Sequence, residues 1–170
     1  MIHPEELPVM EALKNLDIPY TRYEHGLALT MEDCENIGAD VGAQHFKNLF
    51  LANRQGTDFY LMLIGADKKF RTADISKQLG VSRLSFCTPE QLMDKLSLKP
   101  GSVTPMALLH DEAHAITVVV DSDIKAMPMV CVHPCTSEVS YALSGPDLFK
   151  FLSWRQNELR FVTVTADDNE

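Results

Sequence analysis

The sequence predicts an α+β fold in which helices flank a mixed β-sheet. The chain has 170 residues, of which 45% are hydrophobic, and this is enough for one compact domain with its own core. Two apolar runs, 46–52 and 59–64, are joined by a polar turn as in a β-hairpin. Helical patterns separate the other strand-like runs without a strict alternation, which favours a mixed sheet over a doubly wound parallel one.

Five helices are predicted from apolar residues at helical spacing and from residues typical of helix ends. In the first, apolar side chains recur from Leu7 to Leu16 after the helix-starting Pro4. Thr88 and Pro89 supply an N-cap and a first-turn proline for a later helix. The predicted ranges are 7–16, 30–37, 72–79, from 88 onward, and 146–154.

Apolar and alternating runs predict five strands besides the hairpin, at 20–25, 116–120, 129–133, 139–143 and 161–165. The tail 166–170 is acidic and is expected to fray. One domain is therefore expected over residues 1–170. Gly-rich phosphate-binding fingerprints are absent from the sequence, so nothing supports nucleotide binding by a P-loop or a Rossmann turn.

Composition narrows the classes of function and partner. A net charge of -9 argues against non-specific binding to DNA and other polyanions, so any nucleic acid must be held locally. The four cysteines are scattered, and reduced thiols are expected. No apolar run approaches the roughly 18 residues of a membrane span, and no signal-like segment begins the chain. We therefore expect a cytoplasmic protein that has no membrane partner.

Three motifs at the edges of strand-like runs are candidates for chemistry. Lys47 interrupts an apolar run, so its ammonium either reaches solvent along its aliphatic stem or meets an anion in a cleft. The segment 101–105 could present main-chain N–H groups to an anion or a carbonyl, although ordinary turns have the same composition. His133, just before Pro134, either binds substrate and moves protons or is a hydrogen-bonded structural residue.

A basic cluster and a cysteine–histidine pattern also leave alternatives open. Lys68, Lys69 and Arg71 form the tight basic cluster of this acidic chain, either as a solvated turn or as a phosphate contact. Cys131 and Cys135 flank His133 at alternate positions, which in a regular strand would share one face and could bind zinc. This spacing is unusual for zinc, so buried thiols and no metal are expected. Catalysis by a Ser-His-Asp triad is not indicated, because Ser102 lacks the nucleophile-elbow context.

Taken in order, residues 47–51, residues 98–105 and the His133-Pro134 pair resemble the YbaK/prolyl-tRNA synthetase insertion-domain family. The greatest similarity is to its free-standing alanyl-tRNA(Pro) deacylases of the PrdX or ProXp-ala type, and it extends from Leu7 to about Thr165. The resemblance implies a mixed, barrel-like sheet flanked by helices. It also implies hydrolysis of the ester that joins a wrongly attached amino acid to tRNA.

The resemblance implies roles for individual residues as well. Lys47 corresponds to the lysine that holds the 3' end of the tRNA, the 101–105 loop lines the aminoacyl pocket, and His133 is a pocket residue. Family enzymes recruit the 2'-hydroxyl of the terminal adenosine and water, so neither a protein nucleophile nor a cofactor is expected. Main-chain donors near Gly101 and Ser102 are candidates for stabilising the oxyanion. The expected catalytic residues are Lys47, Gly101, Ser102 and His133, and the expected substrate-binding residues are Leu29, Thr30, Met31, Asn48, Val103, Thr104, Pro105, Lys68, Lys69 and Arg71.

The expected substrate is a mischarged tRNA bound by its aminoacyl end, namely alanyl-tRNA(Pro), with prolyl-tRNA synthetase as a candidate partner. Two departures from the family pattern bear on amino-acid specificity more than on the reaction class. Ser137 stands where the family often has Asn, and residues 26–28 replace a frequent Pro-Pro or Pro-Val. The competing hypothesis is a non-catalytic module that binds aminoacyl-tRNA or an amino acid. The oligomeric state stays open.

Overall fold

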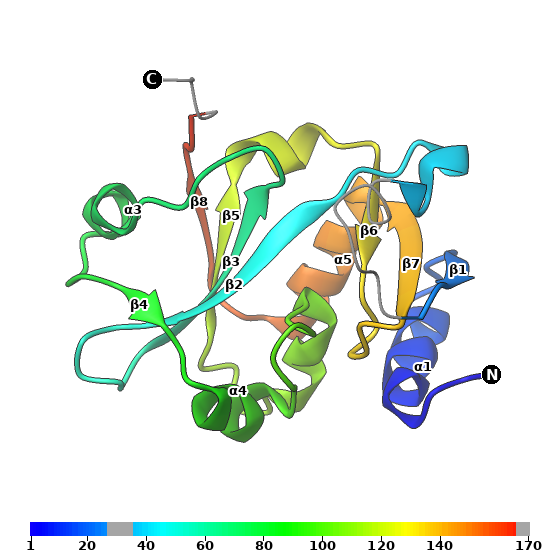
Figure 1. Cartoon of the computed structure of the whole chain (residues 1–170), viewed down its shortest axis with the longest axis horizontal. Helices are drawn as coiled ribbons and strands as arrows, with labels where there is room; N and C mark the ends of the chain where they lie inside the picture. Colours follow the sequence, from blue (N-terminus) through cyan, green and yellow to red (C-terminus); the bar gives the residue numbers. More distant parts are fainter. Residues whose placement is uncertain (27–35, 166–170) are drawn as a thin grey trace.

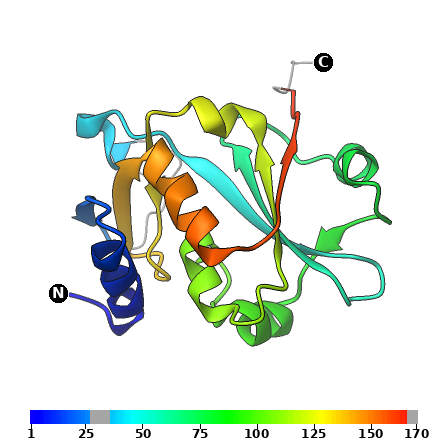
Figure 2. The same cartoon turned by 180° about the vertical axis from the view of Figure 1, so that it is seen from behind.

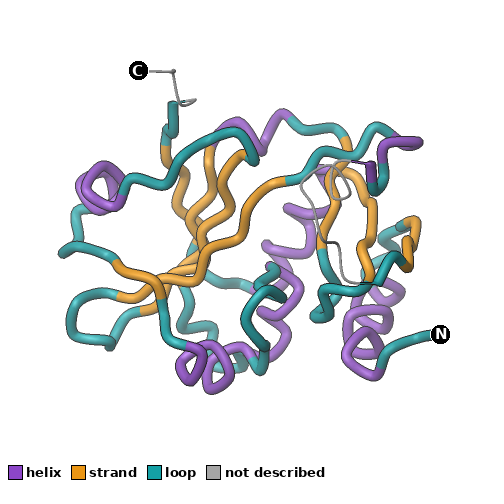
Figure 3. The backbone as a smooth tube through the Cα atoms, in the orientation of Figure 1, coloured by secondary structure: helices purple, strands orange, loops and turns teal. Residues whose placement is uncertain are grey.

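Eight strands form two sheets in the computed structural model, which describes residues 1–26 and 36–165. Figure 3 shows the strands of the two sheets as two separate groups. The smaller sheet has the order β1-β7-β6, with β1 at Thr21–Glu24, β7 at Val139–Ser144 and β6 at Met129–Val132. The larger has the order β4-β2-β3-β5-β8, with β4 at Ser85–Phe86, β2 at Phe46–Ala52, β3 at Phe59–Gly65, β5 at Thr117–Asp121 and β8 at Leu159–Val162.

The strand pairing confirms the predicted mixed α+β class. The β2–β3 hairpin is antiparallel, whereas β5 runs parallel to both β3 and β8. A parallel bridge between Gln44 and Val130 joins the two sheets. Within the described residues the sheets stay open and do not close into the expected barrel-like arrangement.

The helices lie close to their predicted ranges. They are α1 at Leu7–Asn15, α3 at Thr72–Leu79, α4 at Pro89–Leu96 and α5 at Gly145–Arg155. Short 3-10 helices are η1 at Pro4–Glu6, η2 at Ala39–Val41, η3 at Pro105–His110 and η4 at Ser122–Ala126. The predicted 30–37 helix lies mostly outside the described residues. No helix in the described part of the chain has both the length and the apolar character of a membrane span.

One hydrophobic cluster contains residues of both sheets and of α5. Figure 2 shows α5 from behind, where it lies between the two groups of strands, and it contacts β6 and β7. On the other face of the larger sheet, Ile75 and Leu79 of α3 pack in a second cluster with Leu51 and Ile64. Side chains of a strand alternate between faces. Strand β2 therefore contributes to both clusters.

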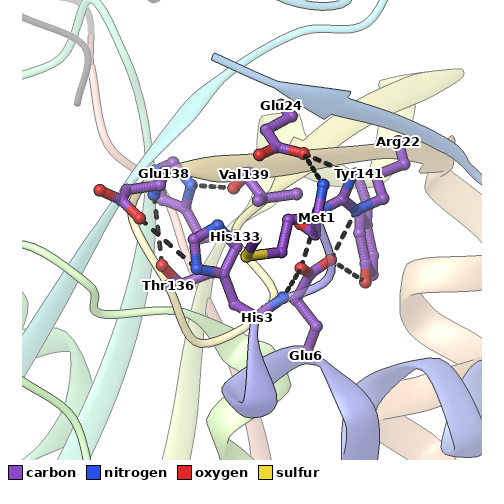
Figure 4. A network of polar contacts seen from close by, with 10 residues as sticks. All are labelled: Met1, His3, Glu6, Arg22, Glu24, His133, Thr136, Glu138, Val139 and Tyr141. Atoms are coloured by element: carbon purple, nitrogen blue, oxygen red, sulfur yellow. Dashed lines mark hydrogen bonds and ion pairs between the residues drawn. The ribbon is translucent and has the colours of Figure 1, made fainter. Parts of the chain in front are cut away.

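A buried carboxylate connects the N-terminal segment to the smaller sheet (Figure 4). Glu6 has no exposed surface, and its oxygens accept from Arg22 Nε and Nη2 at 2.8 Å, from the His3 amide at 2.8 Å and from the Tyr141 hydroxyl at 2.7 Å. The ring of Tyr141 stacks on Tyr20 with centroids 4.3 Å apart. Burial alone would raise the pKa of Glu6, but these donors outweigh it and hold the pKa at about 2.

We expect Glu6→Gln to lower the free energy of unfolding by about 3 kcal/mol at pH 7, because it leaves Arg22 without its buried carboxylate. The folded-state pKa of about 2 lies below the ordinary 4.5. The stabilisation is therefore complete above pH 4.5 and is lost as the pH falls toward 2. Denaturant unfolding across this range measures the difference from wild type. Glu5→Gln, at an exposed neighbouring position, is the control, and an equal loss there would contradict the assignment.

Candidate functional site

The loop before η3 begins with a tight turn that requires glycine. The Ser102 amide donates to the carbonyl of Lys99 at 3.1 Å, and Gly101 has φ +88°. With proline at the second position and glycine at the third, this is the pattern of a type II turn. The Ser102 amide is therefore occupied, which corrects its expected role as an oxyanion donor. In the described part of the chain, no protein acceptor takes the amides of Gly101 or Val103.

Thr104 joins this loop to the end of β6. Its side chain is fully buried, and Oγ1 donates to the carbonyl oxygen of His133 at 2.6 Å. Thr104 Oγ1 also accepts from the Met106 amide at 3.3 Å and so caps η3, which begins at Pro105. The structure thus brings together the 101–105 loop and His133, two of the three predicted motifs.

Hydrogen-bond partners determine which nitrogen of His133 carries the proton. Nδ1 lies 2.9 Å from the carbonyl of Val139 and 3.4 Å from Ser140 Oγ. A carbonyl only accepts, so Nδ1 is the protonated nitrogen and Nε2 of the neutral ring keeps its lone pair. Burial lowers the pKa of His133, with His25 and His45 adding to the effect and the Val139 bond opposing it. His133 is therefore a neutral imidazole near pH 7.

His25 and Ser140 extend this arrangement, and sequence reasoning missed both. His25 Nδ1 lies 2.6 Å from the carbonyl of Gly26 and is the donor, so its Nε2 accepts the Ser140 hydroxyl at 2.9 Å. The two histidine rings lie 6.2 Å apart. His25 follows β1 and Ser140 lies in β7. These two strands pair although they are far apart in sequence. The alternation at 20–25 was the available signal, but it does not reveal which strand pairs with β1.

Lys47 lies on a different face of β2 from its neighbour Asn48. It stands opposite Ile64, whereas Asn48 stands opposite Leu63. The ammonium of Lys47 donates to the carbonyl of Lys68 in the turn after β3. In the described residues no contact joins Lys47 to Gly101 or His133. That all three line one pocket therefore stays a prediction.

The charge of Lys68 is used inside the fold. Lys68 is 6% exposed, and its ammonium lies 2.8 Å from Asp121 Oδ1 and 2.6 Å from Asp123 Oδ2. Burial lowers the pKa of Lys68, but the two carboxylates outweigh it and raise the pKa above its ordinary value. Asp121 also accepts the Gly65 amide at 3.0 Å. The expected phosphate contact by Lys68 is therefore wrong, whereas Lys69 and Arg71 are exposed.

A cleft of about 290 Å³ joins Asn48 of β2 to the loop residues Gly101 and Val103. Apolar side chains, Phe50 and Leu92 among them, form much of its lining. The buried Oδ1 of Asn48 has no hydrogen-bond partner in the described part of the protein. This cleft is therefore lined by Asn48, whose side-chain oxygen is unpaired within the described residues, by two loop residues whose amides are likewise unpaired there, and by an apolar wall.

The remaining predicted positions divide into two groups. Leu29, Thr30 and Met31, expected to gate the size of the amino-acid side chain, lie outside the described residues. Cys131 and Cys135 are buried, and burial raises their pKa values to about 11 and about 12. Strand β6 ends at Val132, so the alternation that suggested a shared face with His133 does not extend to Cys135. Within residues 1–26 and 36–165, no three His, Cys, Asp or Glu side chains are placed to hold a metal ion.

Known proteins resemble this chain in sequence and in fold. A prolyl-tRNA editing protein, ProX, from Acetoanaerobium sticklandii is 31% identical over 156 residues, which cover 92% of this chain and 95% of that protein. The prolyl-tRNA synthetase associated domain-containing protein 1 of Danio rerio is 29% identical over 149 residues, covering 86% and 80%. A crystal structure assigned provisionally to a trans-editing enzyme for prolyl-tRNA synthetase superposes with a TM-score of 0.72 at 16% identity, covering 98% of this chain and 100% of that one. That superposition shows a shared fold.

The family model for the aminoacyl-tRNA editing domain matches residues 25–151. The match covers more than half of the 170 residues and includes Lys47, the 101–105 loop and His133. Together with the similarity of the bacterial editing protein over nearly the whole chain, this shows that the chain belongs to the aminoacyl-tRNA editing domain family.

Proposed function

We propose that this protein is a deacylase that hydrolyses mischarged tRNA(Pro), with alanine as the amino acid removed. The observation that carries the proposal is the Thr104–His133 hydrogen bond, which fixes the 101–105 loop beside a neutral histidine. Membership of the editing-domain family and the names of the relatives support the same substrate class. The proposal places the activity in the cytoplasm and makes prolyl-tRNA synthetase a candidate partner.

The site supplies groups suited to hydrolysis of an activated ester. A water molecule, held by the 2'-hydroxyl of the terminal ribose, gives its proton to Nε2 of His133 as its oxygen attacks the ester carbonyl carbon. The amides of Gly101 and Val103 stabilise the negative charge that develops on the carbonyl oxygen. The bond to the 3' oxygen then breaks, and that oxygen takes the proton from His133. Positioning and these hydrogen bonds do most of the work, since the ester is already reactive.

The hydroxyls and thiols near His133 are poorly placed to attack an ester. Thr104 donates its hydroxyl proton to the His133 carbonyl. Ser140 donates its own to His25, but it is 2% exposed and is closed to a substrate. Ser102 Oγ makes no hydrogen bond to a base within the described residues. Cys131 and Cys135 stay protonated near pH 7 because burial raises their pKa values. This supports attack by water, with the 2'-hydroxyl of the substrate assisting.

Alanine is the proposed amino acid because the proline site of a synthetase excludes smaller amino acids only weakly. A pocket shaped for proline excludes a smaller apolar side chain by only about 1–3 kcal/mol. A separate hydrolase for the smaller product restores accuracy. The apolar wall of the cleft beside Asn48 suits a small side chain of this kind.

We expect the protein to release labelled alanine from alanyl-tRNA(Pro) faster than it releases amino acids from other mischarged tRNAs. Lys47→Ala should lower kcat/KM by roughly 10- to 100-fold, the value of a charge-assisted contact to the 3' end. Lys77→Ala, at an exposed position of α3, is the matched control. Unchanged release by the Lys47 variant would refute its assigned role. Tight binding of aminoacyl-tRNA with no turnover of any substrate would favour a binding module instead.

Gly101→Ala should lower deacylation by roughly 10- to 100-fold, because misplacing the loop amides moves them off the ester. An added Cβ at Gly101 would meet no atom within 4 Å, so the change acts through its φ of +88°, at a cost of about 1–2 kcal/mol. Gly80→Ala has the same open surroundings at φ +71° but lies at the end of α3. It should cost similar stability and leave the rate unchanged. Equal loss of activity in both variants would point to general destabilisation.

The tautomer of His133 can be observed directly. Nitrogen-15 NMR at pH 7 should show Nδ1 protonated and Nε2 unprotonated, as the bond to the Val139 carbonyl requires. Because burial lowers the pKa of His133, its neutral form should persist as the pH falls below the ordinary value of 6.5. Ser140→Ala removes the weaker contact at 3.4 Å and should leave the Nδ1–H tautomer in place. A ring protonated on both nitrogens at pH 7, or on Nε2 alone, would rule out His133 as the proton acceptor.

A further inference from the structure

Phe86 presents an aromatic ring to solvent at the edge of the larger sheet. It is 62% exposed, the highest value for an aromatic side chain in the described part of the chain. The strand that carries it, β4, has two residues and pairs with Leu51 and Ala52 of β2. The ring packs on Phe70 in a T-shaped arrangement, with centroids 5.6 Å apart and planes at 69°. Much of this aromatic side chain is thus accessible to a ligand at the sheet edge.

Phe86 lines two hollows. One is the cleft of about 290 Å³ that also contains Asn48, Gly101 and Val103. The other, of about 310 Å³, is lined by Phe70 and Arg83 together with residues around them. The exposed ring therefore borders both hollows, one of which contains Asn48 and Gly101 of the candidate site.

Cations gather beside this ring although the chain as a whole is acidic, with a net charge of -9. Arg83 lines the second hollow and is exposed. Lys69 and Arg71 flank Phe70 in sequence, and both are exposed. Lys68 does not add to this charge, because Asp121 and Asp123 neutralise it. The aromatic surface and the local positive charge thus occur together.

We propose that the Phe86 platform, formed by Phe86, Phe70, Arg83 and Lys69, binds the single-stranded 3' end of the tRNA, with one unpaired base stacked on Phe86. Exposed aromatic rings flanked by cations are how proteins hold single-stranded nucleic acid, since every base has a stacking face and every link carries a negative charge. The strand continues along the cleft toward Asn48 and Gly101, where the ester lies. The inference rests on the proposed function for the identity of the RNA.

The kinetic test compares two substrates of different length. Phe86→Ala should raise KM for alanyl-tRNA(Pro) about tenfold or more, the usual effect of losing one stacked base. Its effect on kcat/KM for 3'-O-alanyl-adenosine should be smaller, because this substrate lacks the stacked base although Phe86 also borders the cleft. Phe86→Tyr keeps an aromatic face and should behave as wild type. Trp154→Ala removes another exposed aromatic ring, on α5, and should change neither parameter.

Binding separates this inference from the proposed function. A fluorescent RNA ending in ACCA, without an amino acid, should bind wild type about tenfold more tightly than Phe86→Ala. Arg83→Ala should reduce the slope of log affinity against log salt by about 0.7, the value for one phosphate contact on a single strand, while Lys77→Ala leaves it unchanged. This result would support the platform even if no ester were hydrolysed.

Three results would overturn the inference. Equal RNA binding by wild type and Phe86→Ala would show that no base stacks there. Equal losses on alanyl-tRNA(Pro) and on alanyl-adenosine would show that Phe86 acts on the fold of the site. Loss of binding to prolyl-tRNA synthetase with RNA binding intact would make the surface a protein contact.

Discussion

The hydrogen bond from the Thr104 hydroxyl to the carbonyl of His133 is the interaction on which the candidate site depends. It is 2.6 Å long and its donor has no exposed surface. Losing the acceptor would leave a buried hydroxyl unpaired at a cost of about 1–3 kcal/mol. The loop therefore stays in one position relative to β6. Thr104, which follows Gly101 and Val103 in this loop, is thereby held against the backbone of His133.

Charged groups around the site serve mainly to hold the fold. Lys68 pairs with Asp121 and Asp123 and so connects the end of β3 to the end of β5. Glu6 and Arg22 join η1 to β1 in the same way. Removing one partner of such a buried pair is costly because the other charge is left without compensation. These two ion pairs are thus committed to positioning, and main-chain groups and a neutral histidine are left to meet the ester.

Features set by neighbouring residues could be predicted from the sequence, and features set by distant pairing could not. The β2–β3 hairpin and the N-cap at Thr88 depend on a few adjacent residues, and both were predicted. The ion pair of Lys68 depends on Asp121, which is 53 residues away. From the sequence the basic cluster was therefore expected to be available to phosphate, although Lys68 is buried. The contact between Ser140 and His25 depends on the pairing of β1 with β7, which short-range periodicity does not reveal. The Ser102 amide was expected to be a free donor, but it donates to the carbonyl of Lys99 across the Pro100-Gly101 turn.

A protein with a net charge of -9 must obtain its affinity for tRNA near the point of chemistry. Each phosphate contact adds attraction that does not depend on the attached amino acid. With Lys68 neutralised and the chain at -9, contacts to the body of the tRNA contribute little. Binding then depends on the bases of the 3' end and on the ester itself. Correctly charged tRNA shares those bases, so discrimination between substrates falls to the pocket around the amino acid, where a small difference in side-chain size has its largest effect.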